Sequence, residues 1–181
     1  MERRQEEIDL RICTYNVNSI RKKIDVIREI LKSCDVFLCQ ETILLDEDDN
    51  FLNLIDKDFC VYSRFSSLSH NGDGRPIGGM AIFLRRELNL GVCIREMCEN
   101  YMIARVTVRE CSFNLLNIYM PCDTGTVQSL GDYQQVLGAL QLSIDSLDDC
   151  PIVCAGDFNA GPSRGRFWPY LLFRLFGRSR F

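Results

Sequence analysis

The chain has 181 residues, 46% of them hydrophobic and 25% charged, with a formal net charge of −4. This composition is typical of one globular domain and excludes an intrinsically disordered chain. No apolar run reaches the ~18 residues that a membrane-spanning helix needs. The charged residues 1–7 lead into no signal-type apolar stretch. We therefore expect a protein of the nucleus or cytoplasm that is not secreted and does not bind membranes.

The negative charge is unevenly distributed along the chain. Residues 162–181 hold five arginines and no acid, which leaves 16 basic and 25 acidic residues, or −9, in residues 1–161. The acidic run at 46–49 predicts a solvated loop. Net charge alone does not predict a strong, salt-dependent affinity for DNA.

The ten cysteines predict reduced thiols. A disulfide framework is typical of secreted domains, and the N-terminal residues do not have the form of a secretory signal. No two cysteines have the Cys-x2-Cys spacing typical of zinc sites, and the chain has a single histidine.

The first predicted elements are a strand, a helix and a second strand. Residues 11–18 alternate apolar and polar side chains and end with Asn16 and Asn18. From residue 20 to residue 34, apolar side chains recur at steps of three and four, which predicts a helix that Ser19 is placed to cap. Residues 36–42 predict a buried strand that ends at Gln40 and Glu41.

The rest of the chain predicts two hairpins, two helices and a last strand. A short helix is expected at 50–55. Strands at 59–65 and 79–85 are joined by a glycine-rich loop that carries His70, which we expect to be solvated. Strands at 102–108 and 113–119 form the second hairpin, which ends at Tyr119. An amphipathic helix at 127–147 precedes a buried strand at 151–155. Hairpins mixed with βαβ units predict an α/β fold with mixed sheets.

Four predicted strands end in polar side chains that suit a divalent cation and a phosphate. They end at Asn16, Glu41, Tyr119 and the Gly-Asp-Phe-Asn sequence at 156–159. Open α/β sheets bind ligands at the carboxyl ends of their strands. Taken singly, each residue has an ordinary structural explanation as a turn residue, a surface acid or a rim aromatic. Four such ends together favour a functional site.

The order of these residues resembles the endonuclease/exonuclease/phosphatase superfamily. The resemblance rests on Asn16, Gln40-Glu41, Tyr119-x-Pro121 and the Gly-Asp-Phe-Asn sequence, and it covers about residues 8–170. Members include apurinic-site endonucleases, sphingomyelinases and the endonuclease domains of non-LTR retrotransposons. Residues 119–123 and 156–168 are most similar to the retrotransposon (LINE-type) branch. Cys122 departs from the Asn of the apurinic-site enzymes.

The resemblance implies Mg²⁺-dependent hydrolysis of a phosphodiester, with Mn²⁺ as the alternative ion. Glu41 would bind the metal, with Asn16 beside it. Asp157 would act as general base or orient the attacking water, and Tyr119 would donate a hydrogen bond to the phosphate. The asparagines Asn16, Asn18 and Asn159 would bind the phosphate. Asn18 stands where related enzymes often carry Asp.

The superfamily's active site is completed by an Asp-His pair in a Ser-Asp-His motif, and no Ser-Asp-His occurs in the 181 residues. We therefore expect a C-terminally truncated copy: residues 1–166 as the N-terminal part of one domain, and 167–181 as a divergent aromatic and basic tail. Its fold would be a partial four-layer α/β/β/α sandwich with the second sheet largely missing and a sheet face exposed. Weak Mg²⁺ binding and little or no turnover would follow.

The tail at 167–181 has two interpretations. It is either an interfacial amphipathic anchor or unrelated sequence that follows the start of a helix from the parent domain. Pro169 interrupts the segment and no continuous apolar face emerges, which favours the second interpretation.

Three functions remain open from the sequence. The first is a retrotransposon DNA endonuclease that nicks duplex DNA. The second is a phosphoesterase of the same fold that acts on RNA, inositol phosphates or lipids. The third is a non-enzymatic remnant or interaction module.

Overall fold

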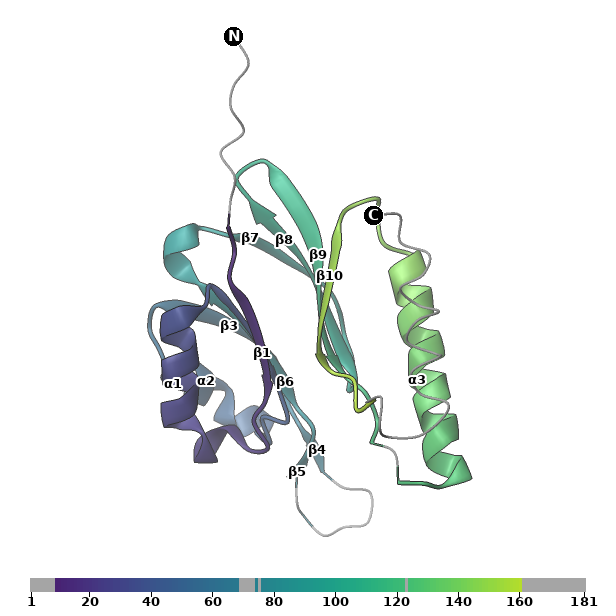
Figure 1. The fold of residues 1–181 in the computed structure, drawn as a ribbon. Coiled ribbons are helices and arrows are strands. Elements are labelled where there is room, and N and C mark those ends of the chain that lie inside the picture. The colour runs from purple at the N-terminus through teal and green to yellow at the C-terminus, as the bar shows by residue number, and fades with distance from the viewer. Residues whose placement is uncertain (1–8, 69–73, 75, 123, 161–181) are drawn as a thin grey trace.

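The computed structural model describes residues 9–68, 74, 76–122 and 124–160. Two β-sheets pack face to face, with α1 and α2 outside the first sheet and α3 outside the second (Figure 1). The predicted α/β fold with mixed sheets is therefore confirmed. The predicted tail at 167–181 and His70 lie outside the described residues, so the predictions for them are not addressed by the structure.

The first sheet has the strand order β1-β2-β6-β3. Its two N-terminal strands are parallel, while β6 runs antiparallel to both of its neighbours. The predicted hairpin around the glycine-rich loop is the β3–β6 pair. The strands are β1 (Ile12–Asn16), β2 (Val36–Gln40), β3 (Phe59–Arg64) and β6 (Met80–Arg85).

The second sheet has the order β10-β9-β8-β7 and holds as many strands as the first. The expectation that this sheet is largely missing was wrong. Strands β8 and β9 form the predicted antiparallel hairpin, and β10 pairs with β9 in parallel. The strands are β7 (Gly91–Met97), β8 (Tyr101–Val108), β9 (Cys111–Tyr119) and β10 (Ile152–Asp157).

The helices begin and end close to the predicted positions. The predicted first helix is divided into a 3-10 turn η1 and α1, and Ser19 makes no side-chain cap hydrogen bond. Thr126 and Ser129 form a capping box that begins α3. The acidic run at 46–49 is not a loop but the turn η2 and the start of α2. The helices are η1 (Ile20–Lys22), α1 (Ile24–Ser33), η2 (Asp46–Asp48), α2 (Asp49–Asn53), η3 (Arg86–Leu88) and α3 (Val127–Asp145), and two short strands, β4 (Ser67–Leu68) and β5 (Pro76–Ile77), pair with each other.

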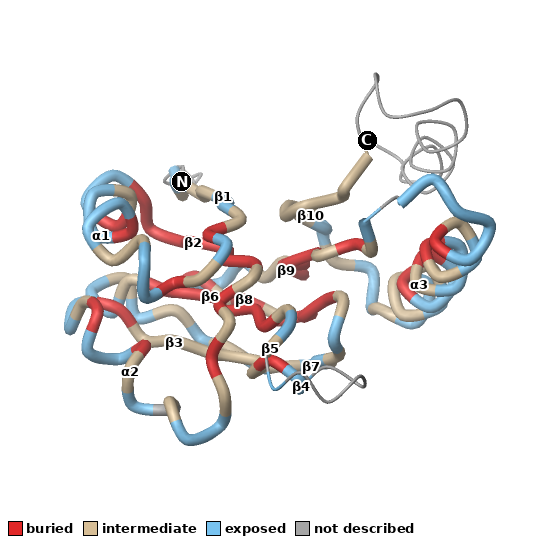
Figure 2. The backbone as a smooth tube through the Cα atoms, turned by 90° about the horizontal axis from the view of Figure 1, so that it is seen from below, coloured by how far each residue is buried: buried red, intermediate tan, exposed pale blue. Residues whose placement is uncertain are grey.

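The fold has four layers: the helices α1 and α2, the first sheet, the second sheet and the helix α3. A cluster of buried apolar side chains lies at each of the three boundaries between them. Figure 2 shows buried residues along β2, β6, β8 and β9 and on the sheet-facing sides of α1 and α3. Successive side chains of a strand point to opposite faces, so Phe37 packs under α1 while Leu38 packs between the sheets. Leu115 of β9 lies in the layer between the sheets, and Leu116 packs under α3. The first sheet is thus covered on both faces, and the expected exposed face is absent from the part of the chain that the structure describes.

Two strands of the large sheets differ from the sequence prediction, and the short strands β4 and β5 were not predicted either. Strand β10 was expected to be buried, but all of its residues are partly or fully exposed, because it lies at the edge of its sheet. Strand β7 was not predicted. Among the described residues, no helix has the length and apolar character needed to cross a membrane.

Candidate functional site

The carboxyl ends of four strands meet at one edge of the sandwich. Asn16 is the last residue of β1 and Glu41 follows β2 directly, and these two strands are parallel neighbours in the first sheet. Tyr119 and Asp157 are the last residues of β9 and β10 and are paired across the second sheet. The structure therefore brings together four of the predicted site residues, two from each sheet.

The side-chain amide of Asn16 lies between two carboxylates. Its Nδ2 donates to Oε1 of Glu41 at 2.8 Å and to Oδ2 of Asp157 at 2.8 Å. A carboxamide nitrogen carries two protons, so both bonds form at once. One neutral donor thereby holds together two negative groups that would otherwise repel each other.

The phenol of Tyr119 joins the same cluster. Its hydroxyl donates to Oε1 of Glu41 at 3.0 Å. Burial raises the pKa of Tyr119 well above its ordinary value, and the carboxylates of Glu41 and Asp157 raise it further. The phenol is therefore protonated, and a hydrogen-bond donor, throughout the physiological range.

Asp157 and Asn159 form a tight turn after β10. The backbone N–H of Asn159 donates to Oδ1 of Asp157 at 2.9 Å, and Asn159 has a left-handed φ of 47°. Its Nδ2 donates to the carbonyl of Met120 at 2.7 Å. One proton of that amide thus fixes the turn to the residue that follows β9, and no described residue accepts the second proton, which a ligand could use.

Asn18 contributes through its backbone. Its N–H donates to Oδ1 of Asn16 at 3.1 Å, which fixes the orientation of the Asn16 amide. The side chain of Asn18 is exposed, and the described residues give it no hydrogen bond. The structure therefore does not bring this side chain into the cluster as the sequence predicted.

Gly156 allows β10 to approach β9 closely just before Asp157. It has a φ of 146°, which residues with a side chain rarely adopt, and a Cβ there would lie 2.6 Å from the backbone N of Ile118 and closer still to its carbonyl oxygen. This close approach sets the pairing of Asp157 with Tyr119.

The donor set suits a hard divalent cation. Glu41 and Asp157 supply carboxylate oxygens, and Oε2 of Glu41 has no hydrogen-bond partner among the described residues. Mg²⁺ is commonly bound by one or two carboxylates and keeps several waters. Within the described ranges there is no group of three or more His, Cys, Asp or Glu side chains that could hold a metal ion. The residues thus fit Mg²⁺ or Mn²⁺ with open positions, and not a closed zinc site.

Three polar residues that had no predicted role, Thr14, Gln40 and Asn117, lie beneath this cluster. Gln40 and Asn117 are fully buried, and Gln40 is bonded to both Asn117 and Thr14. The sequence did contain one indication of this contact: Asn117 lies inside the apolar run of β9. Burying an amide without a hydrogen-bond partner is costly, so an asparagine at such a position indicates that a buried partner exists.

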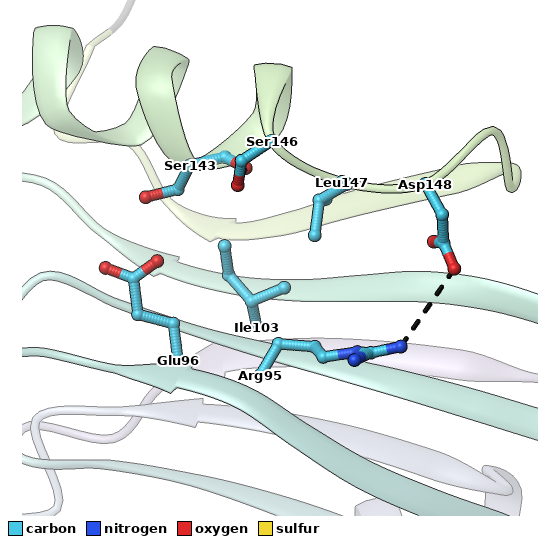
Figure 3. Close-up of a pocket in the computed structure, with 7 residues that line it drawn as sticks. All are labelled: Arg95, Glu96, Ile103, Ser143, Ser146, Leu147 and Asp148. Carbon is cyan, nitrogen blue, oxygen red and sulfur yellow. Dashed lines mark hydrogen bonds and ion pairs between the residues drawn. The ribbon is translucent and has the colours of Figure 1, made fainter.

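A separate cavity of about 330 Å³ lies between α3 and the β7–β8 hairpin (Figure 3). Arg95 and Asp148 face each other across it, with N and O atoms 4.0 Å apart. None of the predicted site residues lines it. The lining residues are Arg95, Glu96, Ile103, Ser143, Ser146, Leu147 and Asp148.

The sequence model of the Endonuclease/Exonuclease/phosphatase family matches residues 13–180. No curated protein sequence matches the chain.

Solved structures share the fold at low sequence identity. An AP endonuclease from Archaeoglobus fulgidus is 21% identical with a TM-score of 0.59, over 86% of this chain and 60% of that one. The 3′ phosphatase NExo from Neisseria, bound to a product DNA hairpin, is 15% identical with a TM-score of 0.61, over 92% and 71%. The endonuclease domain of TRAS1, a telomere-specific non-LTR retrotransposon, is 14% identical with a TM-score of 0.63, over 93% and 71%. The chain thus spans 60% of the length of the archaeal structure.

Proposed function

The chain belongs to the endonuclease/exonuclease/phosphatase family, and we propose that it carries the metal- and phosphate-binding part of a site that hydrolyses phosphodiesters in DNA. The observation that carries this proposal is the Asn16 amide, which joins Glu41 of one sheet to Asp157 of the other. An arrangement that holds two acids together around one neutral donor suits a cation and a phosphate better than it suits a structural role.

Glu41 is the metal ligand in this proposal, through Oε2, to which no described residue donates a hydrogen bond; Asn16 is bonded to the other oxygen of the same carboxylate. A bound Mg²⁺ or Mn²⁺ supplies charge stabilisation to the phosphoryl and leaving oxygens. Hydrogen bonds from Asn16 and Tyr119 to Oε1 hold the Glu41 carboxylate in one orientation. Such outer contacts tune the affinity of a metal site.

Asp157 is the general base or the group that orients the attacking water. Its two oxygens accept bonds from the Asn16 side chain and the Asn159 backbone, which fix the plane of the carboxylate. The second Nδ2 proton of Asn159 is the donor to charge that develops on the phosphate. The hydroxyl of Tyr119 has one proton, which it donates to Glu41 in this structure, and it would act on the phosphate only by exchanging that bond. Phosphate binding is thus assigned to neutral donors.

DNA is the proposed partner, in particular duplex DNA that the site nicks. The Neisseria structure of the same fold is bound to a DNA hairpin, and the TRAS1 domain comes from a retrotransposon. The sequence at 119–123 and 156–168 is most similar to the retrotransposon branch. These observations support a retrotransposon-type endonuclease over the RNA- or lipid-directed alternatives.

We propose that the 181 residues alone turn over slowly. They contain no Ser-Asp-His sequence, and their single histidine, His70, lies outside the described residues. Loss of one member of a catalytic unit lowers the rate by about 10³-fold or more.

The test is nicking of supercoiled plasmid by the purified chain in Mg²⁺ or EDTA, with and without added imidazole in place of the histidine. We expect Mg²⁺-dependent binding of a labelled duplex, with nicking that is slow, increases with imidazole and disappears in Asp157→Ala. Binding without nicking would support the DNA-binding part of the proposal and refute catalysis by these residues. Folded protein that shows neither metal-dependent binding nor nicking would overturn the proposal.

A further inference from the structure

A group of polar side chains, Thr14, Gln40 and Asn117, lies directly beneath the candidate site and is called the polar layer below. Thr14 is two residues before Asn16 on β1, Gln40 is one residue before Glu41, and Asn117 is two residues before Tyr119 on β9. Three of the strands that supply the site therefore also supply this layer. Gln40 and Asn117 are both 0% exposed.

The layer connects the two sheets by hydrogen bonds. Nε2 of Gln40 donates to Oδ1 of Asn117 at 2.6 Å and to Oγ1 of Thr14 at 3.0 Å. Nδ2 of Asn117 donates to the carbonyls of Cys39 and Ala81, at 3.1 and 3.0 Å. A single amide of β9 is thus bonded to two neighbouring strands of the first sheet, β2 and β6.

The surroundings of this pair are apolar. Leu38, Ile82 and Leu115 belong to the same layer between the sheets and are fully buried. Apolar contacts are not directional, so they hold the sheets together without fixing how far one is displaced along the other. Hydrogen bonds have narrow distance and angle requirements and do fix that displacement.

Glu41 connects this layer to the site. Successive residues of a strand normally point to opposite faces, yet Gln40 contacts Asn117 while Glu41 contacts Tyr119, and both partners lie on β9. The left-handed φ of 55° at Glu41 ends the regular strand and permits both contacts. The position of Glu41 relative to Tyr119 therefore depends on the bond one residue earlier.

We propose that Gln40 and Asn117 are positioning residues that set the register of the two sheets, so that Glu41 and Asn16 meet Tyr119 and Asp157. This inference rests on the proposed function, because it takes the cluster at the strand ends to be the active site. The buried amide pair would act by fixing the distances between the site residues of the first sheet and those of the second, without contacting substrate or metal itself.

The decisive variant is the double substitution Gln40→Leu/Asn117→Leu. Each single change leaves a buried amide partly unsatisfied and lowers stability. The double change removes both amides, although the carbonyls of Cys39 and Ala81 lose the Asn117 donor and stability still falls. If the pair only stabilises the fold, the folded double variant should keep the wild-type geometry of the site; if the pair positions the site, that geometry should change.

Two readouts measure that geometry without relying on activity. The first is Mn²⁺ affinity by electron paramagnetic resonance, which we expect to fall about 10-fold or more in the double variant. The second is the NMR signal of the Asn16 side-chain amide, assigned by its loss in Asn16→Asp. We expect this signal to move toward the position of an unbonded amide. Wild-type Mn²⁺ affinity and an unchanged Asn16 signal in the double variant would overturn the inference.

Two further variants make the test complete. Asn114→Leu removes an equally buried asparagine of β9 that bonds to Asp148 and lies far from the site, so it should leave both readouts unchanged. Gln40→Met is the alternative if the double variant does not fold, because Asn117 keeps its bonds to the carbonyls of Cys39 and Ala81. This variant should show the same fall in Mn²⁺ affinity and the same movement of the Asn16 signal.

A wild-type chain that binds no Mn²⁺ would count against the proposed function, and the Asn16 signal would still decide the positioning role.

Discussion

Asn16 and Asp157 are 141 positions apart in the sequence, and Nδ2 of Asn16 lies 2.8 Å from Oδ2 of Asp157. The two residues end the edge strands β1 and β10, which belong to different sheets. The contact exists only when the sheets have packed against each other. The candidate site therefore depends on the complete sandwich and cannot be formed by either sheet alone.

The first prediction concerns Asn16 itself. Asn16→Ala removes the donor that holds Glu41 and Asp157 together, so the two carboxylates should separate and Mn²⁺ affinity should fall about 10-fold. The control is Asn18→Gly, which keeps the backbone N–H that bonds to Asn16 and tolerates the φ of 43° at this position. Titration of both variants by electron paramagnetic resonance checks the prediction, and equal affinities would contradict it.

The second prediction concerns Gly156. A Cβ at this residue meets the backbone of Ile118, which cannot move without separating β10 from β9. Gly156→Ala should therefore lower the free energy of unfolding by about 3 kcal/mol, the upper end of the range for overpacking. In Gly138→Ala, the new methyl group points into open space on α3, and about 0.5–1 kcal/mol should be gained. Urea unfolding of both variants gives the comparison; a neutral Gly156→Ala would mean that the close approach is absent.

The third prediction concerns acid stability and Asp35. Hydrogen bonds from Arg11 lower the pKa of the Asp35 carboxyl below its ordinary value of 3.8, and the charge of Arg85 lowers it further. The unfolded state thus binds a proton more readily than the native state, so the stabilisation is present above pH 3.8 and is lost as the pH falls through the lowered pKa. Asp35→Asn should lower the free energy of unfolding by about 2 kcal/mol at pH 7.

That difference should shrink toward zero as the pH falls below 3.8. Asp25→Asn is the matched control, because Asp25 is fully exposed and lies 3.9 Å from Arg28; it should change stability very little at any pH. A difference for Asp35→Asn that stays constant down to acidic pH would contradict the assigned cause.

The fourth prediction concerns alkaline stability and Tyr119. Its pKa is raised above the ordinary 10.0, so above pH 10 the unfolded state loses this proton while the native state keeps it. Native stability should therefore fall as the pH rises from 10 through the raised pKa. Tyr119→Phe removes this term, so its stability relative to the wild type should improve by up to about 1.4 kcal/mol per pH unit in that range. Urea unfolding between neutral and alkaline pH is the measurement, and a difference that does not change with pH would contradict the prediction.

The sequence predicted most strands because their apolar side chains recur with the period of a sheet, and it placed four site residues at strand ends. Strand β7 was missed because only Val92 and Ile94 are apolar on its partly buried side, where the charged Glu96 takes the next position. The extent of the second sheet was also predicted incorrectly. It was inferred from the resemblance to a larger domain, although three of its four strands had been predicted individually.

The Gln40–Asn117 bond shows what the sequence pattern leaves open. An asparagine in an apolar run indicates that a partner exists, but it does not say which residue, and the partner lies 77 positions away. Asn18 shows another case: the bond of its backbone N–H to Asn16 was not predicted, and the predicted binding of phosphate by its side chain stays a prediction. The packing of the two sheets decides the first contact, whereas the second is made within one turn at the end of β1.

The most direct test of the account is Mn²⁺ binding to the wild-type chain and to Glu41→Gln, which keeps the shape of the side chain and removes its charge. We predict one bound ion per wild-type chain and an affinity at least about 10-fold lower in the variant, with an unchanged circular dichroism spectrum. Asp46→Asn, a change to an exposed acid away from the strand ends, should bind as the wild type does. Equal Mn²⁺ binding by wild type and Glu41→Gln would contradict the claim that Glu41 is the metal ligand of this site.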